Sequence, residues 1–133
     1  IPVINLLKGR RRIKLIVAPG EYEDDSQGMI SSSTSDFFNN IHADKVFIST
    51  QGINEAGEIT VPKLADAHVK QALLRAGRER ILLADKSKFG QTFLAGHGRI
   101  TDFDYIVSQT GFPDFLAAQL SNHVQLLLAE TPS

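Results

Sequence analysis

Four polar and charged residues follow an apolar run near the middle of the chain. Residues 81–84 are Ile-Leu-Leu-Ala, and they pass directly into Asp85, Lys86, Ser87 and Lys88. A short apolar run bounded by polar residues is typical of a strand buried on both faces. Ligands of open α/β sheets bind outside the carboxyl ends of such strands. An acid, a hydroxyl and two ammonium groups at that place suit an anion or a sugar phosphate.

Asp85 and Lys88 each have two interpretations in this loop. The Asp85 carboxylate can accept hydrogen bonds from sugar hydroxyls, or it can accept them from the amides of its own turn. The Lys88 ammonium is a compact point charge that suits phosphate, but it can equally be an exposed loop cation. The loop therefore predicts a site only if the sheet brings further polar groups to the same edge.

Two other predicted strands end in turns that could supply such groups. A strand at 13–17 is followed by Gly20, and a strand at 45–49 is followed by Gln51 and Gly52. The carboxyl ends of parallel strands meet at one edge of a sheet, so we expect these turns to lie beside the charged loop.

Lys70 belongs to a predicted helix at 64–76. That helix carries an apolar stripe made of Ala65, Val69, Ala72, Leu73 and Ala76. Because Lys70 follows a residue of the stripe, its side chain lies about 100° round the helix from the core. It can reach toward the sheet edge, or it can be an ordinary solvated helix lysine.

The remaining elements alternate along the chain. Residues 1–7 are a short strand or a helix end, 52–57 a turn-rich loop, and 93–95 a short strand or coil before a flexible Gly-His-Gly. Further strands are predicted at 80–84, 105–107 and 124–128, and further helices at 36–41, capped by Ser33, Thr34 or Ser35, and at 114–121. Alternation of this kind favours parallel pairing with right-handed crossovers. The predicted fold class is α/β, one domain over 1–133 with an open, mostly parallel Rossmann-like sheet and helices on its faces.

Charge and composition limit the partners of this chain. A net charge of −1 gives no basic footprint for nucleic acid over the whole chain. The segment 8–14 is an exception, with five cations in seven residues that can contact phosphate or form a solvated loop. The acidic segment 21–27 is expected to be an exposed loop, because it lacks the regular ligand spacing of a cation site.

Several kinds of chemistry are not expected here. The chain has no cysteine, which excludes disulfides, zinc thiolate sites and thiol catalysis. Its four histidines show no zinc spacing, and no phosphate-binding loop or nucleophile elbow is present. We therefore predict no metal, no cofactor and no catalytic residue.

Several segments together resemble the C-terminal sensory domain of the DeoR family of bacterial transcription regulators. They are 43–60, 68–77, 81–90 and 101–111, and they fall in the order and spacing of that family. The most specific piece is Leu-Ala-Asp-Lys-Ser-Lys-Phe-Gly at 83–90. The resemblance covers nearly the whole chain.

That family implies a fold related to those of ribose-5-phosphate isomerase and CoA transferases. It implies a phosphorylated sugar or related metabolite as effector, and a winged helix-turn-helix domain ahead of this chain that binds operator DNA. The expected protein is a cytoplasmic, homo-oligomeric regulator, a repressor of sugar use, with no membrane partner. Residues 1–133 themselves are expected to make no DNA contact. Since the chain starts at Ile1 without a methionine, we expect it to be a fragment.

The resemblance also implies where the effector binds. By position it favours six pocket residues, which are Gly20, Gln51, Gly52, Lys70, Asp85 and Lys88. The chain departs from the family pattern in two ways. The family's acidic-Gly-Thr-Thr loop, which typically holds phosphate, precedes this chain. Gln51 stands where many members of the family keep an aspartate. An amide cannot act as a general base, although it can hydrogen-bond a hydroxyl. The sequence thus favours a binding domain, with a sugar-phosphate isomerase as the alternative.

Overall fold

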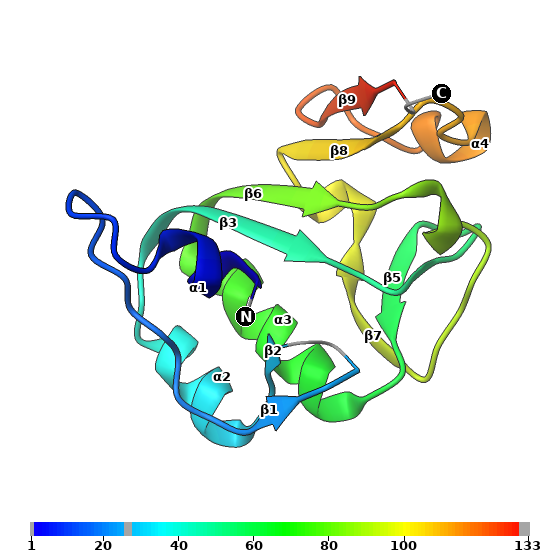
Figure 1. The fold of residues 1–133 in the computed structure, drawn as a ribbon. Helices are drawn as coiled ribbons and strands as arrows, with labels where there is room; N and C mark the ends of the chain where they lie inside the picture. Colours follow the sequence, from blue (N-terminus) through cyan, green and yellow to red (C-terminus); the bar gives the residue numbers. More distant parts are fainter. Residues whose placement is uncertain (1, 26–27, 131–133) are drawn as a thin grey trace.

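The centre of the molecule is a parallel sheet of four strands (Figure 1). A computed structural model describes residues 2–25 and 28–130, which leaves parts of the predicted segments 1–7 and 21–27 outside the described residues. The sheet order is β3, β6, β8, β9, and every neighbouring pair is parallel. The strands are β3 (Ala43–Ser49), β6 (Gly77–Leu83), β8 (Tyr105–Gln109) and β9 (Gln125–Ala129). The predicted parallel α/β sheet is confirmed, with strand ends shifted along the sequence.

One face of this sheet is buried and the other is largely open. Ile48, Leu82 and Ile106 are neighbours in register, and each is at most 1% exposed. On the opposite face Leu83 is 41% exposed and Leu127 is 49% exposed. The prediction that 81–84 is buried on both faces is therefore wrong at Leu83, whereas Ile81, which shares that face, is only 7% exposed.

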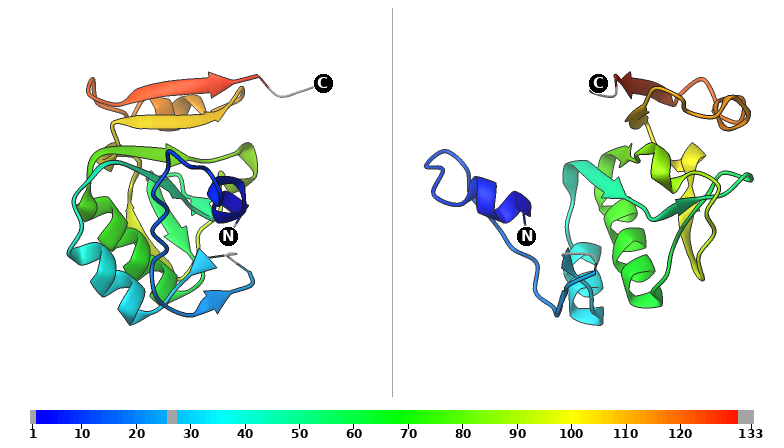
Figure 2. Two further views of the ribbon diagram at one scale, coloured as in Figure 1. Left: turned by 60° about the vertical axis from the view of Figure 1, so that its left-hand side comes forward. Right: turned by 45° about the vertical axis from the view of Figure 1, so that its right-hand side comes forward.

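Two helices pack side by side under the buried face (Figure 2). They are α2 (Ser32–Asn39) and α3 (Leu64–Ala76), and the predicted bounds of α3 are confirmed. The predicted start of α2 is wrong, because the helix begins one turn earlier. Ser31 is its cap, since Ser31 Oγ accepts a hydrogen bond of 3.4 Å from the Thr34 amide.

The inward face of α3 differs in one place from the predicted stripe. Val69 and Ala76 are buried as expected, but Ala65 is exposed. Asp66 and Ala67 face inward instead, at 7% and 2% exposure. A carboxylate therefore occupies an inward position in the first turn of the helix.

A second, antiparallel sheet follows the carboxyl end of β3. It contains β4 (Gly52–Ile53), β5 (Glu58–Val61) and β7 (Ala95–Arg99) in that order. The sequence predicted a turn-rich loop at 52–57, which is confirmed at 54–57 but wrong for Gly52 and Ile53. The predicted flexible Gly-His-Gly is wrong, because these residues lie in β7. Glycine is accommodated in these strands because the neighbouring strand approaches closely. A Cβ on Gly96 would lie 2.9 Å from the carboxylate of Glu58 in β5.

The segment before α2 contains no long strand. It consists of α1 (Pro2–Leu7), a loop, and a two-stranded hairpin of β1 (Tyr22–Glu23) and β2 (Gly28–Met29). The predicted strand at 13–17 is wrong: among the described residues, 14–18 make no backbone hydrogen bonds. A strand needs a paired neighbour, and this segment has none. Helix α1 and the loop after it project from the body (Figure 2).

The chain ends in a short helix and the edge strand β9. Helix α4 (Asp114–Ala117) is shorter than the predicted 114–121. Leu116 is fully buried against the core, whereas Phe115 is 51% exposed.

Candidate functional site

Two pockets adjoin at the first turn of α3. The first, of about 280 Å³, lies between residues 16–18, α2 and α3. The second, of about 190 Å³, lies between the β1–β2 hairpin and the turn after β3. Ile30 and Asp66 line both pockets, so we treat them as one candidate site. Its polar side chains are Glu23, Asp25, Thr34, Gln51, Lys63, Asp66 and Lys70.

Lys70 is a buried part of this site and not a solvated helix lysine. Its side chain is 15% exposed, and Nζ donates a hydrogen bond of 2.8 Å to the carbonyl of Ser49. The Asp66 carboxylate lies 3.9 Å away, one helical turn earlier. Burial lowers the pKa of Lys70, and the negative charge of Asp66 opposes that shift. Lys70 thus ties α3 to the carboxyl end of β3.

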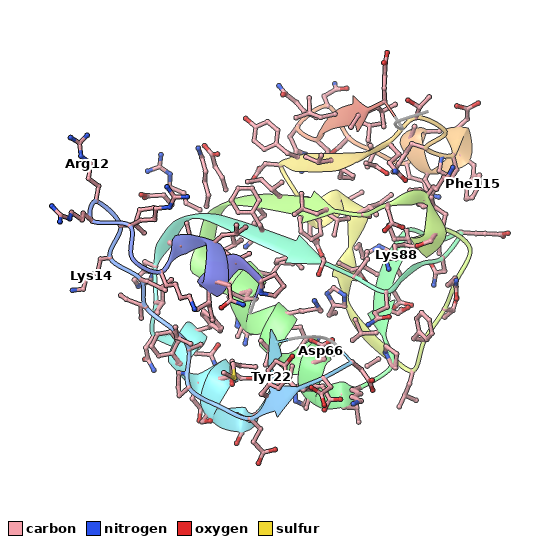
Figure 3. The ribbon with its side chains drawn as sticks, viewed as in Figure 1. Arg12, Lys14, Tyr22, Asp66, Lys88 and Phe115 are labelled. Carbon is pink, nitrogen blue, oxygen red and sulfur yellow. The ribbon has the colours of Figure 1, made fainter. Side chains whose placement is uncertain are left out.

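Asp66 lies at the wall that the two pockets share (Figure 3). Burial raises the pKa of its carboxyl group, while the charges of Lys70 and Lys63 act in the opposite direction. No hydrogen bond from any described residue reaches this carboxylate, and its closest cationic atom is Lys70 Nζ at 3.9 Å. Its acceptor capacity is therefore available to a ligand.

Lys63 connects the β1–β2 hairpin to the start of α3. Its ammonium contacts the Glu23 carboxylate and lies 3.6 Å from Asp25 Oδ2. The hydrogen bond to Lys63 lowers the pKa of Glu23, and the same contact raises the pKa of Lys63. The hairpin therefore forms an outer wall of the second pocket.

A buried hydrogen bond supports the turn that carries Gln51. His97 of β7 is 2% exposed, and its Nε2 lies 2.9 Å from Thr50 Oγ1. Burial, with the nearby charge of Lys70, lowers the pKa of His97 to about 3, so the ring is neutral. Thr50 Oγ1 also lies 3.0 Å from the Thr60 carbonyl. The threonine hydroxyl can donate to that carbonyl while its oxygen accepts the imidazole N–H.

The structure brings two of the six predicted site residues to this place. Gln51 lines the second pocket and Lys70 lines the first. Gly52 is buried beside them in β4, where a Cβ would lie 2.5 Å from the Gln91 carbonyl. Gly20 lies outside both linings, at a positive φ of 138° and against the side chain of Thr34.

Asp85 and Lys88 follow the carboxyl end of β6, and Lys88 lies away from Asp66 (Figure 3). Neither lines the two pockets. The Asp85 carboxylate caps its own turn by accepting a hydrogen bond of 2.9 Å from the Ser87 amide. The hydrogen bond from the Ser87 hydroxyl, together with the one from its amide, lowers the pKa of Asp85. The loop is adjacent to β4, because the Gly90 amide donates to the Ile53 carbonyl at 2.9 Å.

Sequence reasoning missed five polar residues that line the site, and it missed His97, which supports the site from behind. The five are Glu23, Asp25, Thr34, Lys63 and Asp66. Asp66 had an available signal, because it precedes Lys70 by one helical turn and shares its face of the helix. Lys63 and His97 had no local signal, since their partners lie 40 and 47 residues away along the chain. Such long-range pairs become visible only when the fold is known.

The described residues offer little else that could hold a cofactor. Within 2–25 and 28–130, no group of three histidine, aspartate or glutamate side chains could hold a metal ion. In the same part of the chain no helix is long and apolar enough to cross a membrane. The candidate site is thus a pair of adjoining pockets, the first with a mostly apolar lining, whose polar side chains are carboxylates, ammonium groups, a hydroxyl and an amide.

Comparisons with known proteins identify relatives of this chain. The family model described as the DeoR C terminal sensor domain matches residues 1–110. The chain is 28% identical to the HTH-type transcriptional repressor GlcR of Bacillus subtilis (strain 168), over 98% of this chain and 50% of that protein. It is 27% identical to the glycerol-3-phosphate regulon repressor of Escherichia coli (strain K12), over 95% of this chain and 50% of the repressor.

A third relative is an activator. The chain is 28% identical to the L-fucose operon activator of Escherichia coli (strain K12), over 80% of this chain and 44% of the activator. The chain thus spans about half the length of the curated relatives it matches. All three relatives are named as regulators of transcription or of a set of genes.

Proposed function

Because this chain belongs to the DeoR C-terminal sensor domain family, as its motifs predicted, we propose that it binds a small-molecule effector in the paired pockets at the start of α3. The observation that carries this proposal is the position of Lys70. Its ammonium joins the wall of the first pocket to the carbonyl of Ser49, two residues before Gln51 of the second pocket. A ligand that contacts either pocket is thereby coupled to the end of β3.

The effector in this proposal is a phosphorylated sugar or a related metabolite. Gln51 and Asp66 supply groups that hydrogen-bond to hydroxyls, and Lys70 supplies positive charge. Two relatives carry names that refer to glycerol-3-phosphate and to L-fucose, which supports the same class of ligand. Asp85 and Lys88 belong to the proposal as a second wall, because their loop follows β6, the neighbour of β3.

The regulator as a whole is also part of the proposal. The relatives are about twice as long as the matched region, and we propose that a DNA-binding domain ahead of this one contacts the operator. Effector binding would then change the populations of states that bind DNA well and poorly. Because Lys70 connects α3 with β3, the start of α3 is the element through which this change begins.

One observation favours the alternative function, a sugar-phosphate isomerase. Asp66 is a pocket carboxyl group with a raised pKa, and such groups are common among catalytic bases. Against this alternative, Gln51 cannot take up a proton, and His97 is enclosed and neutral. Aldose–ketose turnover on pentose phosphates should therefore be nil, and a turnover that Asp66→Asn abolishes would reverse the preference.

The test of the proposed function is calorimetric titration of the full-length protein. We expect saturable binding of at least one member of a panel of glycerol 3-phosphate, glucose 6-phosphate and fructose 6-phosphate. Lys70→Met should weaken that binding, whereas Lys45→Met, which removes an exposed cation on β3, should not. Absence of binding to every member of the panel would contradict the proposed ligand class.

A further inference from the structure

Asp66 is a nearly buried carboxylate without a hydrogen-bond donor among the described residues. It is 7% exposed, and it lines both pockets. A buried carboxylate is costly unless hydrogen bonds compensate for its lost hydration, so such groups are normally satisfied. The fold places this acid at the wall of a cavity and leaves its oxygen atoms for another molecule to satisfy.

The neighbours of Asp66 do not account for it. Lys70 Nζ is 3.9 Å away, which is too long for a hydrogen bond, and it donates instead to the Ser49 carbonyl at 2.8 Å. Lys63 is engaged with Glu23 and Asp25 of the hairpin. A carboxylate in the first turn of a helix is favoured by the helix dipole, but an exposed side chain would gain that benefit without the cost of burial.

The charges around Asp66 also limit what it can bind. The second pocket is lined by three carboxylates, those of Glu23, Asp25 and Asp66, and by the single ammonium of Lys63. A phosphate dianion placed there would be repelled by this excess of negative charge. Hydroxyl groups carry no charge and donate hydrogen bonds, which is what ionised carboxylates accept.

We propose that Asp66 is the specificity-determining residue of the site, and that it accepts hydrogen bonds from hydroxyl groups of the polyol part of the effector. Gln51, which also lines the second pocket, supplies both a donor and an acceptor to the same hydroxyls. The phosphate of such an effector lies outside this pocket. This inference rests on the proposed function, and it specifies that the second pocket recognises the polyol end of the effector.

The experiment compares Asp66→Asn with wild type in calorimetric titrations of the full-length protein. The probes are glycerol 3-phosphate, glucose 6-phosphate and fructose 6-phosphate, with inorganic phosphate as a probe that lacks carbon-borne hydroxyls. Asp66→Asn should weaken binding of the sugar phosphate about 10- to 100-fold, the usual worth of hydrogen bonds to a charged group. Its affinity for inorganic phosphate should stay as in wild type. Asp44→Asn, an exposed acid on β3, is the matched control and should bind like wild type.

The possible results separate this inference from the proposed function. Equal affinity of wild type and Asp66→Asn for a sugar phosphate would overturn the role of Asp66 and leave the proposed function standing. An equal loss of affinity for sugar phosphate and for inorganic phosphate would overturn the assignment of this pocket to the polyol end. No binding of any sugar phosphate to wild type would overturn both. A melting curve of Asp66→Asn establishes that the variant is folded.

Discussion

His97 Nε2 and Thr50 Oγ1 lie 2.9 Å apart, and their hydrogen bond joins the antiparallel sheet to the turn that ends β3. Gln51, the next residue, lines the second pocket. The pocket wall is therefore held from behind by a buried, neutral imidazole. Within the described residues the other ring nitrogen, Nδ1, has no hydrogen-bond partner, so the Thr50 contact alone fixes the polar side of the ring.

Protonation of His97 should destabilise the fold at acidic pH. The folded-state pKa is about 3, below the ordinary value of 6.5, so the unfolded chain takes up the proton first. The stability that neutral His97 contributes is therefore present above about pH 6.5 and is lost as the pH falls toward the folded-state pKa. His97→Gln, which keeps an amide donor for Thr50 and cannot ionise, should remove this part of the acid sensitivity. Denaturant unfolding as a function of pH measures the effect.

The matched control for that prediction is His42→Gln, because His42 is an exposed histidine. It should leave the pH dependence of the free energy of unfolding as in wild type. If wild type and His97→Gln lose stability equally between neutral and acidic pH, then His97 is not held neutral by its surroundings.

Asp66→Asn should make the ligand-free protein more stable at neutral pH. Burial raises the pKa of Asp66, so its stability contribution is fully present below the unfolded pKa and is lost as the pH rises through the folded pKa. At pH 7 the ionised carboxylate is thus a cost that an uncharged amide avoids. We expect a melting temperature a few degrees higher than wild type at neutral pH, and a smaller difference in acid. A lower melting temperature of Asp66→Asn at neutral pH would mean that the folded protein stabilises the ionised carboxylate of Asp66.

This combination of higher stability and weaker binding is typical of functional residues. It also separates Asp66 from an ordinary structural acid, whose removal would lower stability. Asp44→Asn serves again as control, since an exposed acid should change the melting temperature little at any pH.

The parallel sheet and α3 were predictable because their signals are local. An apolar run such as 45–49 and an apolar helical stripe require no knowledge of distant residues. Two strands of the antiparallel sheet, β4 and β7, were not predictable, because they contain Gly52, Gly96 and Gly98, which usually indicate turns. At Gly52 a Cβ would lie 2.5 Å from the Gln91 carbonyl, so close backbone approach explains that glycine within a strand. The third strand, β5, has no glycine and was missed although its residues Ile59, Thr60 and Val61 are β-branched.

The same distinction applies to the site. Gln51 and Lys70 could be proposed from their places after a strand and on a helix. The segment 13–17 has a strand's composition, yet it stays unpaired, since composition cannot supply a neighbouring strand. Asp66 was missed because an acid in a first helical turn has an ordinary explanation, and only its burial against two pockets excludes that explanation.

Lys70→Met should both weaken effector binding and raise the pKa of His97. The charge of Lys70 is one of the two causes that lower the pKa of His97, so its removal must move that pKa upward. Methionine keeps the apolar stem and lacks the donor to the Ser49 carbonyl. Titration of the histidine ring followed by nuclear magnetic resonance gives the pKa, and calorimetry gives the affinity. Lys70→Arg, which keeps the charge, should leave the pKa of His97 close to wild type.

Lys88→Ala tests whether the charged loop after β6 contributes to effector binding. If this loop is the second wall of the pocket, loss of its ammonium should weaken binding of a sugar phosphate roughly tenfold or more, as expected for a hydrogen bond to a charged group. Lys88→Ala should weaken the binding of inorganic phosphate to a similar degree, because in this proposal the lysine contacts the phosphate group and not the hydroxyls. Lys86→Ala, in the same turn with an exposed side chain, is the control. An affinity of Lys88→Ala equal to wild type would remove Lys88 from the site while leaving Asp66 and Lys70 in place.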